Sequence, residues 1–113
     1  MDIEVGEYVR TNKGSIGKVT EILSGAIAPR VQLETIAVST IMIKNHSKNI
    51  IDLIEVGDYV NGKEICLKDE KENAVVWGFQ LKDEQRIFYL YEQDIKSIVT
   101  REQFKSVEYR LGE

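Results

Sequence analysis

A six-residue phrase occurs twice in the chain, and this repeat limits what the sequence can fold into more than any other feature. Glu4-Val5-Gly6-Glu7-Tyr8-Val9 returns as Glu55-Val56-Gly57-Asp58-Tyr59-Val60, with five of six positions identical and the remaining position acidic in both. The offset of 51 residues, 55 − 4, is close to the length of a minimal β-barrel. The repeat therefore predicts two tandem copies of one small unit, at residues 1–55 and 56–113.

No Gly-, Ser- or Pro-rich linker separates the two copies, because Ile54 is followed directly by the second phrase. A chain of 113 residues has the length of one ordinary domain, so two half-length units would need to share buried surface. We therefore expect two fused lobes that form one rigid unit.

Composition and charge narrow the class of protein. No apolar run approaches the ~20 residues of a membrane span, and Met1–Glu4 lacks the basic and apolar regions of a secretory signal. These features favour a cytoplasmic protein without a membrane partner. The net charge of −4 comes without the basic stripe that is typical of duplex binding. The single cysteine, Cys66, excludes an intramolecular disulfide and a thiolate zinc site, so no metal or cofactor is expected.

Short alternating segments bounded by turn residues predict a mostly-β fold. Arg30–Glu34 alternates polar and apolar residues, so Val31 and Leu33 are expected to face inward. Ile36–Ile43 is β-branched almost throughout, and its change of apolar phase indicates a bulge or bend near Ser39-Thr40. The predicted strand Ile16–Leu23 offers the core candidates Ile16, Val19 and Ile22.

Each copy is expected to end in a closing strand. In the first copy this strand is predicted at Ile50–Ile54, after a polar turn at Lys44–Asn49. In the second copy the corresponding strand is predicted at Ile95–Val99.

The second copy also contains three local signals. Asn61-Gly62 is typical of a type I′ hairpin, with a tight kink as the alternative. Thr100 and Gln103 have the spacing of a capping box, which predicts a short helical turn from Arg101 to about Ser106. Val107–Leu111 then alternates as a strand that could pair with a free sheet edge.

The glycines and lysines of Lys13–Lys18 do not form a phosphate-binding P-loop, because no Ser or Thr follows Lys18 and no strand-to-helix context surrounds it. Val9-Arg10, Gly14 and Gly17-Lys18-Val19, with Ile22, instead resemble the KOW motif. This motif is the loop-and-strand signature of SH3-like barrels in ribosomal and transcription-elongation proteins. The resemblance covers residues 5–23 and implies two tandem SH3-like (KOW-like) β-barrel lobes, followed by the C-terminal helical turn. The second copy lacks the glycine pair.

A second resemblance runs over the whole chain and includes Asn49–Ile54, the phrase that follows it, and Ile98–Phe104. These segments resemble small uncharacterised proteins of phages and prophages of Gram-positive bacteria. The resemblance implies a location in the host cytoplasm and transfers no catalytic residue. It also implies an inhibitor of host machinery, with an anti-defence or anti-CRISPR role as one form.

Aromatic residues are concentrated in the second copy, and their surplus on the predicted strand Arg86–Tyr91 indicates a protein-binding surface. Acidic residues follow this strand, so the partner is expected to be basic. The candidate protein-binding residues are Trp77, Tyr89, Tyr91, Glu92 and Asp94. The alternative is a nucleic-acid-binding surface on the first copy, formed by Arg10, Lys13, Lys18 and Arg30.

Enzymatic chemistry is not expected, and no residue is a catalytic candidate. His46 is the single histidine, and no triad partner lies at a recognisable spacing from it. The leading hypothesis is a non-enzymatic phage accessory protein that binds and modulates a host or phage protein. The alternatives are a KOW-like nucleic-acid-binding module and a self-assembling structural protein whose Val107–Leu111 edge pairs between chains.

Overall fold

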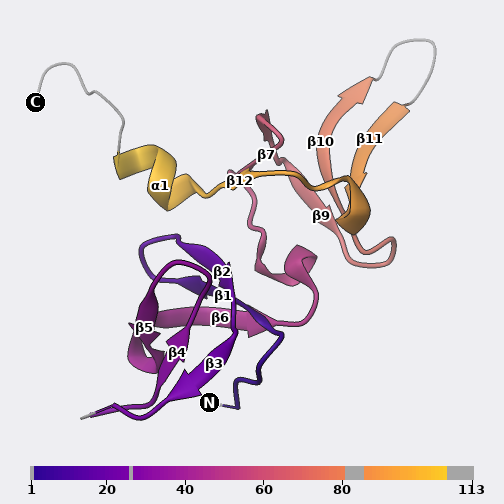
Figure 1. Ribbon diagram of the computed structural model, residues 1–113. Coiled ribbons are helices and arrows are strands. Elements are labelled where there is room, and N and C mark those ends of the chain that lie inside the picture. The colour runs from indigo at the N-terminus through magenta and orange to yellow at the C-terminus, as the bar shows by residue number, and fades with distance from the viewer. Residues whose placement is uncertain (1, 26, 81–85, 107–113) are drawn as a thin grey trace, which may run out of the picture. The chain divides into compact units, whose positions relative to one another are not determined.

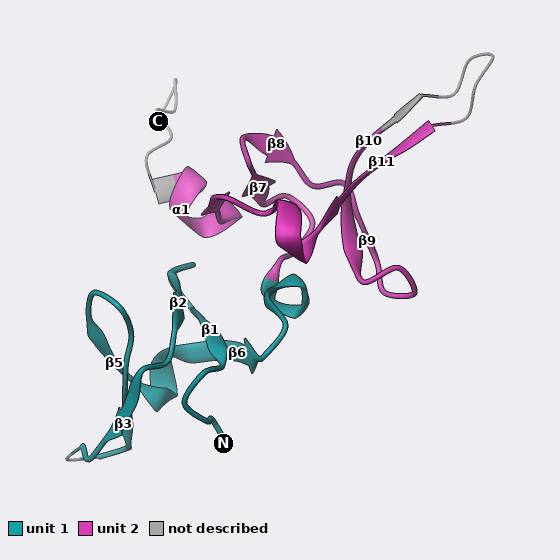
Figure 2. Cartoon of the chain, turned by 45° about the vertical axis from the view of Figure 1, so that its right-hand side comes forward, with its two compact units in different colours: residues 1–53 teal, residues 54–113 magenta. Residues whose placement is uncertain are grey.

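The computed structural model describes residues 2–25, 27–80 and 86–106 (Figure 1). The chain divides into two compact units, Met1–Leu53 and Ile54–Glu113 (Figure 2). The boundary lies two residues before the expected one, 55 − 53. The prediction that the two units form one rigid body stays a prediction. The described part of the chain is mostly β-structure, arranged as four three-stranded sheets without a closed barrel.

Unit 1 consists of two three-stranded sheets. Its first, second and last strands form the sheet β2-β1-β6, and its three middle strands form the sheet β3-β4-β5. The strands are β1 (Tyr8–Thr11), β2 (Ile16–Lys18), β3 (Glu21–Leu23), β4 (Arg30–Gln32), β5 (Ala37–Ser39) and β6 (Ile43–Ser47). The 3₁₀ helix η1 (Thr40–Met42) precedes the last strand, and the 3₁₀ helix η2 (Ile50–Leu53) follows it.

Unit 2 repeats this order of elements. The sheet β8-β7-β12 again joins the first, second and last strands, and β9-β10-β11 joins the middle three. The strands are β7 (Tyr59–Val60), β8 (Lys63–Glu64), β9 (Leu67–Asp69), β10 (Ala74–Gln80), β11 (Arg86–Tyr91) and β12 (Ile98–Val99). The 3₁₀ helix η3 (Glu92–Asp94) precedes the last strand, and α1 (Arg101–Ser106) follows it.

The repeated phrase forms the same backbone turn in both units. In Glu4–Glu7 and in Glu55–Asp58, the last residue donates its N–H to the carbonyl of the first, at 3.1 and 3.0 Å. The third residue is Gly6 or Gly57, with φ angles of +95° and +97°. A turn of this kind with a positive φ at its third position favours glycine, which explains why glycine occurs in both copies.

The acid that ends each turn also accepts a hydrogen bond through its side chain. Glu7 Oε2 accepts from the N–H of Glu4 at 2.7 Å, and Asp58 Oδ2 accepts from the N–H of Glu55 at 2.7 Å. A carboxylate that accepts from a backbone N–H makes a charge-assisted bond, which is stronger than a neutral one. The phrase therefore closes each turn twice, once through the backbone and once through the acid.

Each turn also fixes the strand that returns beside it. The turn's glycine donates to the carbonyl of Val19 in unit 1 and of Ile65 in unit 2, at 2.9 Å in both. The N–H of Val19 and of Ile65 in turn donates to the carbonyl of the turn's acid, at 2.8 Å in both. Both side chains are buried, so the turn places one core residue in each unit.

The two units differ at the acid that distinguishes the two phrases. Glu7 has the longer side chain, and its Oε1 lies 3.2 Å from His46 Nδ1 on β6. Asp58 is fully buried, and its Oδ1 accepts from the N–H of Arg101 at 2.8 Å. The exchange of one acid for another thus ties the turn to the last strand in unit 1 and to the first residue of α1 in unit 2.

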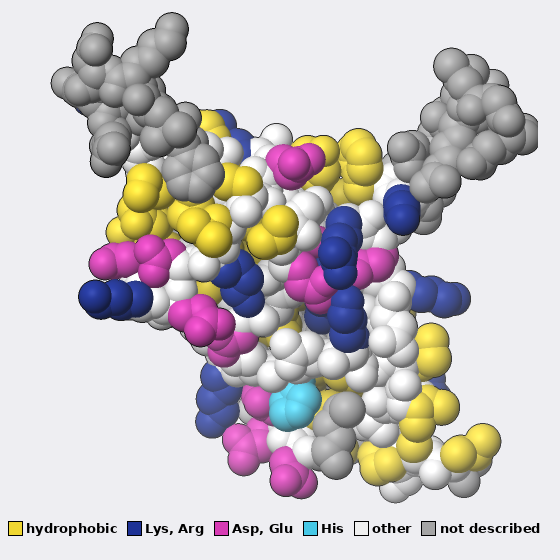
Figure 3. All heavy atoms as spheres, turned by 180° about the vertical axis from the view of Figure 1, so that it is seen from behind, with side chains coloured by type: hydrophobic (Ala, Val, Ile, Leu, Met, Phe, Trp, Pro, Cys, Tyr) yellow, Lys and Arg dark blue, Asp and Glu magenta, His cyan; other side chains and the backbone are white. Residues whose placement is uncertain are grey.

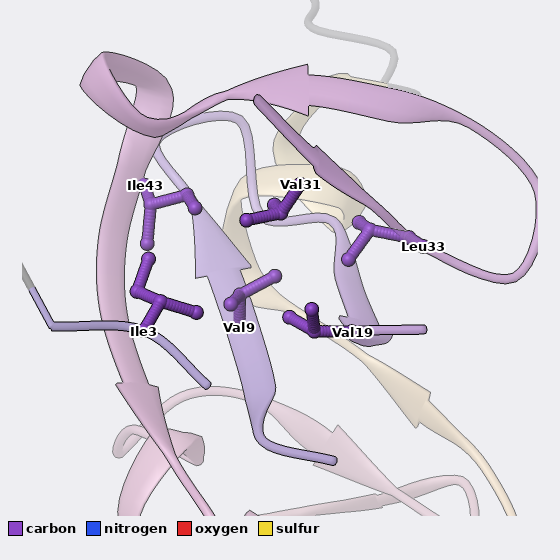
Figure 4. Close-up of a cluster of buried hydrophobic side chains, with 6 residues drawn as sticks. All are labelled: Ile3, Val9, Val19, Val31, Leu33 and Ile43. Atoms are coloured by element: carbon purple, nitrogen blue, oxygen red, sulfur yellow. The ribbon is translucent and has the colours of Figure 1, made fainter. Parts of the chain in front are cut away.

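Each unit has its own buried side chains. In unit 1, side chains from β1, β4 and β6 point toward one another (Figure 4), and the cluster is Ile3, Val9, Val19, Val31, Leu33 and Ile43. The inward orientation predicted for Val31 and Leu33 is confirmed. The predicted core position of Ile22 is wrong, because this side chain is 47% exposed. In unit 2 the buried apolar residues are Ile54, Val60, Ile65, Ala74, Val75 and Val76.

The closing strand of unit 1 was predicted at the wrong segment. Ile50–Leu53 is the helix η2, and the last strand is β6, which includes part of the predicted polar turn. Strand β6 lies at the edge of its sheet. Its exposed side chains can therefore be polar without removing apolar contacts from the core. Asn49 starts η2, because its side-chain oxygen accepts from the N–H of Ile51 at 3.2 Å.

The irregularity predicted near Ser39-Thr40 lies at that position but has a different cause. Instead of a bulge in one long strand, η1 separates β5 from β6. The side-chain oxygen of Ser39 accepts from the N–H of Ile41 at 3.4 Å and caps this helix. The change of apolar phase therefore marks a helix between two short strands.

Two local predictions in unit 2 are confirmed. Asn61 and Gly62 have φ angles of +52° and +77° in the two-residue β7–β8 hairpin, as a type I′ turn requires. The Thr100 Oγ1 accepts from the N–H of Gln103 at 3.3 Å, and Gln103 Oε1 accepts from the N–H of Thr100 at 3.1 Å. The capping box thus precedes α1, whereas β12 is shorter than the predicted strand.

Among the residues that the structure describes, no helix is long and apolar enough to cross a membrane.

The acid of the first turn predicts a pH dependence of stability. The N–H of Glu4 and the contact with His46 lower the pKa of Glu7 below 4.5, against the opposing effect of burial. Because the carboxylate is favoured in the folded state, its stabilisation is present above pH 4.5 and is lost as the pH falls through the lowered folded pKa. Glu7→Gln should therefore lower the free energy of unfolding by roughly 1 kcal/mol at pH 6 and by less at pH 3.

Urea unfolding at the two pH values measures this difference. Glu21→Gln is the matched control, because Glu21 is an exposed acid of unit 1 outside the turn. An equal loss for Glu7→Gln at both pH values would contradict the role assigned to the carboxylate.

Candidate protein-binding surface of unit 2

The hairpin of β10 and β11 carries most of the predicted protein-binding residues. Alternate side chains of β11 point to opposite faces, so Ile87, Tyr89 and Tyr91 share one face and Phe88 lies on the other. The pairing with β10 shifts register between Val76 and Gly78. Val75 and Val76 lie before this shift, on opposite faces of β10, and both are fully buried.

Tyr89 and Tyr91 are brought together, as their spacing on one strand requires. Their ring centroids lie 5.8 Å apart with the ring planes 29° from parallel. Both side chains are half-buried, so each ring keeps part of its surface open. We call Ile87, Tyr89 and Tyr91 the tyrosine face.

An acid on β9, which is separated from β11 by β10 in the same sheet, orients the first tyrosine. The Tyr89 hydroxyl donates to Asp69 Oδ2 at 3.2 Å across from β9. Burial raises the pKa of Tyr89, and the hydrogen bond to Asp69 raises it further. Glu72 acts on the same pKa through its charge, so a second acid lies close to this ring. Neither acid was among the predicted site residues, because β9 and the turn after it are near Tyr89 only through strand pairing.

Glu92 and Asp94 follow the tyrosine face in η3, and both are exposed. Asp94 has a structural role, since its Oδ2 accepts from the N–H of Tyr91 at 3.1 Å and its carbonyl accepts from Asn61 Nδ2 at 2.8 Å. Glu92 is therefore the predicted acid that is more available to a partner.

Trp77 does not join the tyrosine pair. Its ring stacks on Phe88, with centroids 4.7 Å apart and planes 30° from parallel, and Phe88 belongs to the opposite face of β11. Lys63 Nζ lies 4.2 Å from the centroid of the Trp77 ring, a cation–π contact with β8. The predicted set of five residues is thus divided between two faces of the hairpin, because Val76 lies opposite Tyr89 and the next residue, Trp77, points to the other face.

A groove beside α1 is a further concave feature of unit 2 that the sequence did not reveal. Tyr59 and Phe104 stack at its wall, with centroids 4.9 Å apart. Tyr59 donates its hydroxyl to Glu64 at 3.0 Å, and Arg101 pairs with Glu55 at 2.6 Å. The groove has a volume of about 450 Å³ and is lined by Gly57, Tyr59, Glu64, Arg101, Glu102, Phe104 and Lys105.

The four basic residues of the alternative site do not form one surface. Arg10 is fully buried, and its Nη1 donates to the carbonyl of Leu53 at 2.9 Å, so its predicted role in contacting nucleic acid is wrong. Lys18 lies on β2, where its Nζ is 5.7 Å from the centroid of the Tyr8 ring. Arg30 begins β4 in the other sheet, and Lys13 is exposed in the β1–β2 turn.

His46 lies on β6 and contacts Glu7, the acid of the turn of unit 1. Within residues 2–25, 27–80 and 86–106, no group of three or more His, Cys, Asp or Glu side chains could hold a metal ion.

Comparison of the chain with protein-family models, with curated proteins and with solved structures finds no match. Function is therefore inferred from the residues and their geometry.

The tyrosine–acid contact predicts a change in the ionisation of Tyr89. In Asp69→Asn, the lost carboxylate should allow the pKa of Tyr89 to fall toward its ordinary value of 10.0. Alkaline titration followed by tyrosinate absorbance should show one tyrosine that titrates at lower pH than in the parent protein.

Tyr89→Phe identifies the residue responsible. In the Tyr89→Phe variant, a further Asp69→Asn substitution should leave the titration of the other tyrosines unchanged. A shift of the same size in the presence and absence of the Tyr89 hydroxyl would contradict the assigned contact.

Proposed function

We propose that the protein is a non-enzymatic binding protein whose partner protein docks on the tyrosine face. The observation that carries this proposal is the pair of stacked, half-open rings of Tyr89 and Tyr91 on one strand. Tyrosine is enriched among the residues that dominate binding energy at protein interfaces, because a ring covers much area at a low cost in side-chain entropy. Ile87 is 48% exposed and extends the apolar area along the strand.

The charges around the tyrosine face support a basic partner. Asp69 and Glu72 both raise the pKa of Tyr89, and Glu92 follows Tyr91 directly in the chain. Acidic groups at the margin of an interface increase the rate at which an oppositely charged partner associates. The Asp69 bond also fixes the Tyr89 ring before a partner arrives, which lowers the entropic cost of binding.

The order of elements supports the finer fold assignment, two tandem SH3-like lobes. In the described residues each unit has six strands with a short break between the second and the third, a 3₁₀ helix before the last strand, and the same strand neighbours. If β2 and β3 are counted as one bent strand, and β8 and β9 as another, each unit has the five strands of an SH3-like lobe. The identical turns at their starts indicate that both lobes derive from one unit.

The biological setting follows from the resemblance to small phage and prophage proteins. In this proposal the protein acts in the host cytoplasm, where it binds and inhibits or modulates a host protein, with anti-defence action against systems such as CRISPR as one form. The same surface would serve a phage-encoded partner. The nucleic-acid alternative has less support, since Arg10 is buried and the other three basic residues are spread over two sheets and a turn. The self-assembly alternative based on Val107–Leu111 lies outside the described residues.

Capture from a host lysate tests the proposal. The double variant Ile87→Asp/Tyr91→Asp places two charges on the tyrosine face, and it should reduce recovery of the specific partner at least tenfold, as expected for loss of a hot spot of about 2 kcal/mol. Quantitative mass spectrometry of nuclease-treated eluates measures this recovery.

Val99→Asp is the matched control, because Val99 is an exposed apolar residue of β12 with 44% of its surface open. Equal recovery with the parent protein and the double variant would reject the tyrosine face as the docking site. Loss of recovery on nuclease treatment would favour the nucleic-acid alternative.

A further inference from the structure

Two uncharged segments of unit 1 meet at one end of the sheet β3-β4-β5. Residues 22–29 and 35–43 contain no charged side chain, although 30% of the chain is charged. The first segment includes the β3–β4 loop, and the second includes η1. The N–H of Thr40 donates to the carbonyl of Pro29 at 2.9 Å, which joins the start of η1 to the end of the loop. We call the exposed residues Ile22, Ile27, Pro29 and Ile41 the apolar end.

The apolar end leaves large hydrophobic side chains open to solvent. Ile27 is 93% exposed and Ile41 is 66% exposed, the two highest values among the exposed large hydrophobic residues of the described chain. In Figure 3, hydrophobic side chains gather at the lower right, where the β3–β4 loop of Figure 1 lies after the half turn. Single exposed apolar residues are ordinary, but a group on one uncharged end of a sheet indicates an interaction surface.

The shape of the apolar end combines a projection with a hollow. Ile27 projects from the loop, and a hollow of about 410 Å³ is lined by residues 22–25 and 27–29. Gly25 and Ala28 approach each other closely, because a Cβ added at Gly25 would collide with the carbonyl oxygen of Ala28. The backbone thus holds Ile27 beside the hollow.

We infer that the apolar end is the interface between two copies of this chain. In a two-fold interface each copy contributes the same patch, so the patch has to fit itself in both shape and charge. A projection next to a hollow allows each Ile27 to enter the hollow of the other copy. The uncharged surface brings no like charges together, although the whole chain carries a net charge of −4 and would repel its copy elsewhere.

The rim of the apolar end is also complementary to itself. Glu21 and Arg30 flank the first uncharged segment with opposite signs, and the Arg30 side chain lies close to Gly25 of the loop. Under two-fold symmetry an acid on one copy can face a base on the other. The apolar end carries no charge that could attract a basic protein. This favours a second copy of the chain over the basic partner of the tyrosine face.

Sedimentation velocity over a series of protein concentrations tests the inference. The parent protein should associate to a species with twice the mass of the single chain. Ile27→Asp should weaken this association by about tenfold or more, because each two-fold interface would then bury two carboxylates. The fold should be unaffected, since the Ile27 side chain is almost fully exposed.

Val56→Asp is the matched control, because it adds the same charge at an apolar residue of unit 2 that is 51% exposed. It should leave association unchanged, and association should persist at high salt because the centre of the interface is uncharged. A parent protein that remains monomeric throughout the series would overturn the inference, whether or not the apolar end then binds vesicles or another protein. Dimerisation that Ile27→Asp leaves intact would overturn it as well.

The inference is independent of the proposed function. It concerns unit 1, whereas the tyrosine face belongs to unit 2. Ile27→Asp should retain capture of the basic partner in a lysate, and Ile87→Asp/Tyr91→Asp should retain self-association. Either proposal can therefore fail while the other holds.

Discussion

The structure depends on one contact that it makes twice, the bond between an acidic side chain and the backbone N–H three residues before it. Glu7 and Asp58 make this bond to Glu4 and Glu55 at the same length of 2.7 Å. A hydrogen bond to a charged group contributes about 1.5–3 kcal/mol, a large share of the stability of a small unit. The contact closes a turn that only a residue tolerant of positive φ can complete, and the turn then fixes the first two strands of its unit.

The length of the acidic side chain determines which other group each turn contacts. The longer Glu7 reaches the histidine of the last strand, whereas the shorter Asp58 stays within the core and accepts from the first N–H of α1. The exchange of one methylene group thus links the same turn to different neighbours. In unit 2 this arrangement supports the helix that carries Phe104 beside Tyr59. The surfaces of the two units can therefore differ while their starting turns remain the same.

The sequence was informative where structure depends on neighbours along the chain. The repeat, the type I′ hairpin at Asn61-Gly62 and the capping box of Thr100 follow from local backbone chemistry and could be predicted. The errors arose where pairing across the fold decides. Ile50–Leu53 looks like a strand from its β-branched residues, but β1 pairs with the polar strand β6 instead, and Ile50–Leu53 forms the helix η2.

The candidate site shows the same division. Tyr89 and Tyr91 could be placed together because they are two apart on one strand. Trp77 could not be assigned to its face without knowing the register of β10 against β11, and Arg10 could not be recognised as buried because its partner is a carbonyl 43 residues away.

Hydrogen exchange at single amides tests the role of the repeated acid most directly. In Asp58→Ala, the amides of Glu55 and Arg101 should exchange faster than in the parent protein, because both donate to the Asp58 carboxylate. The amide of Glu4 should exchange as before, since its acceptor is Glu7. Unchanged protection of Glu55 and Arg101 in a folded Asp58→Ala variant would contradict the central role of this carboxylate.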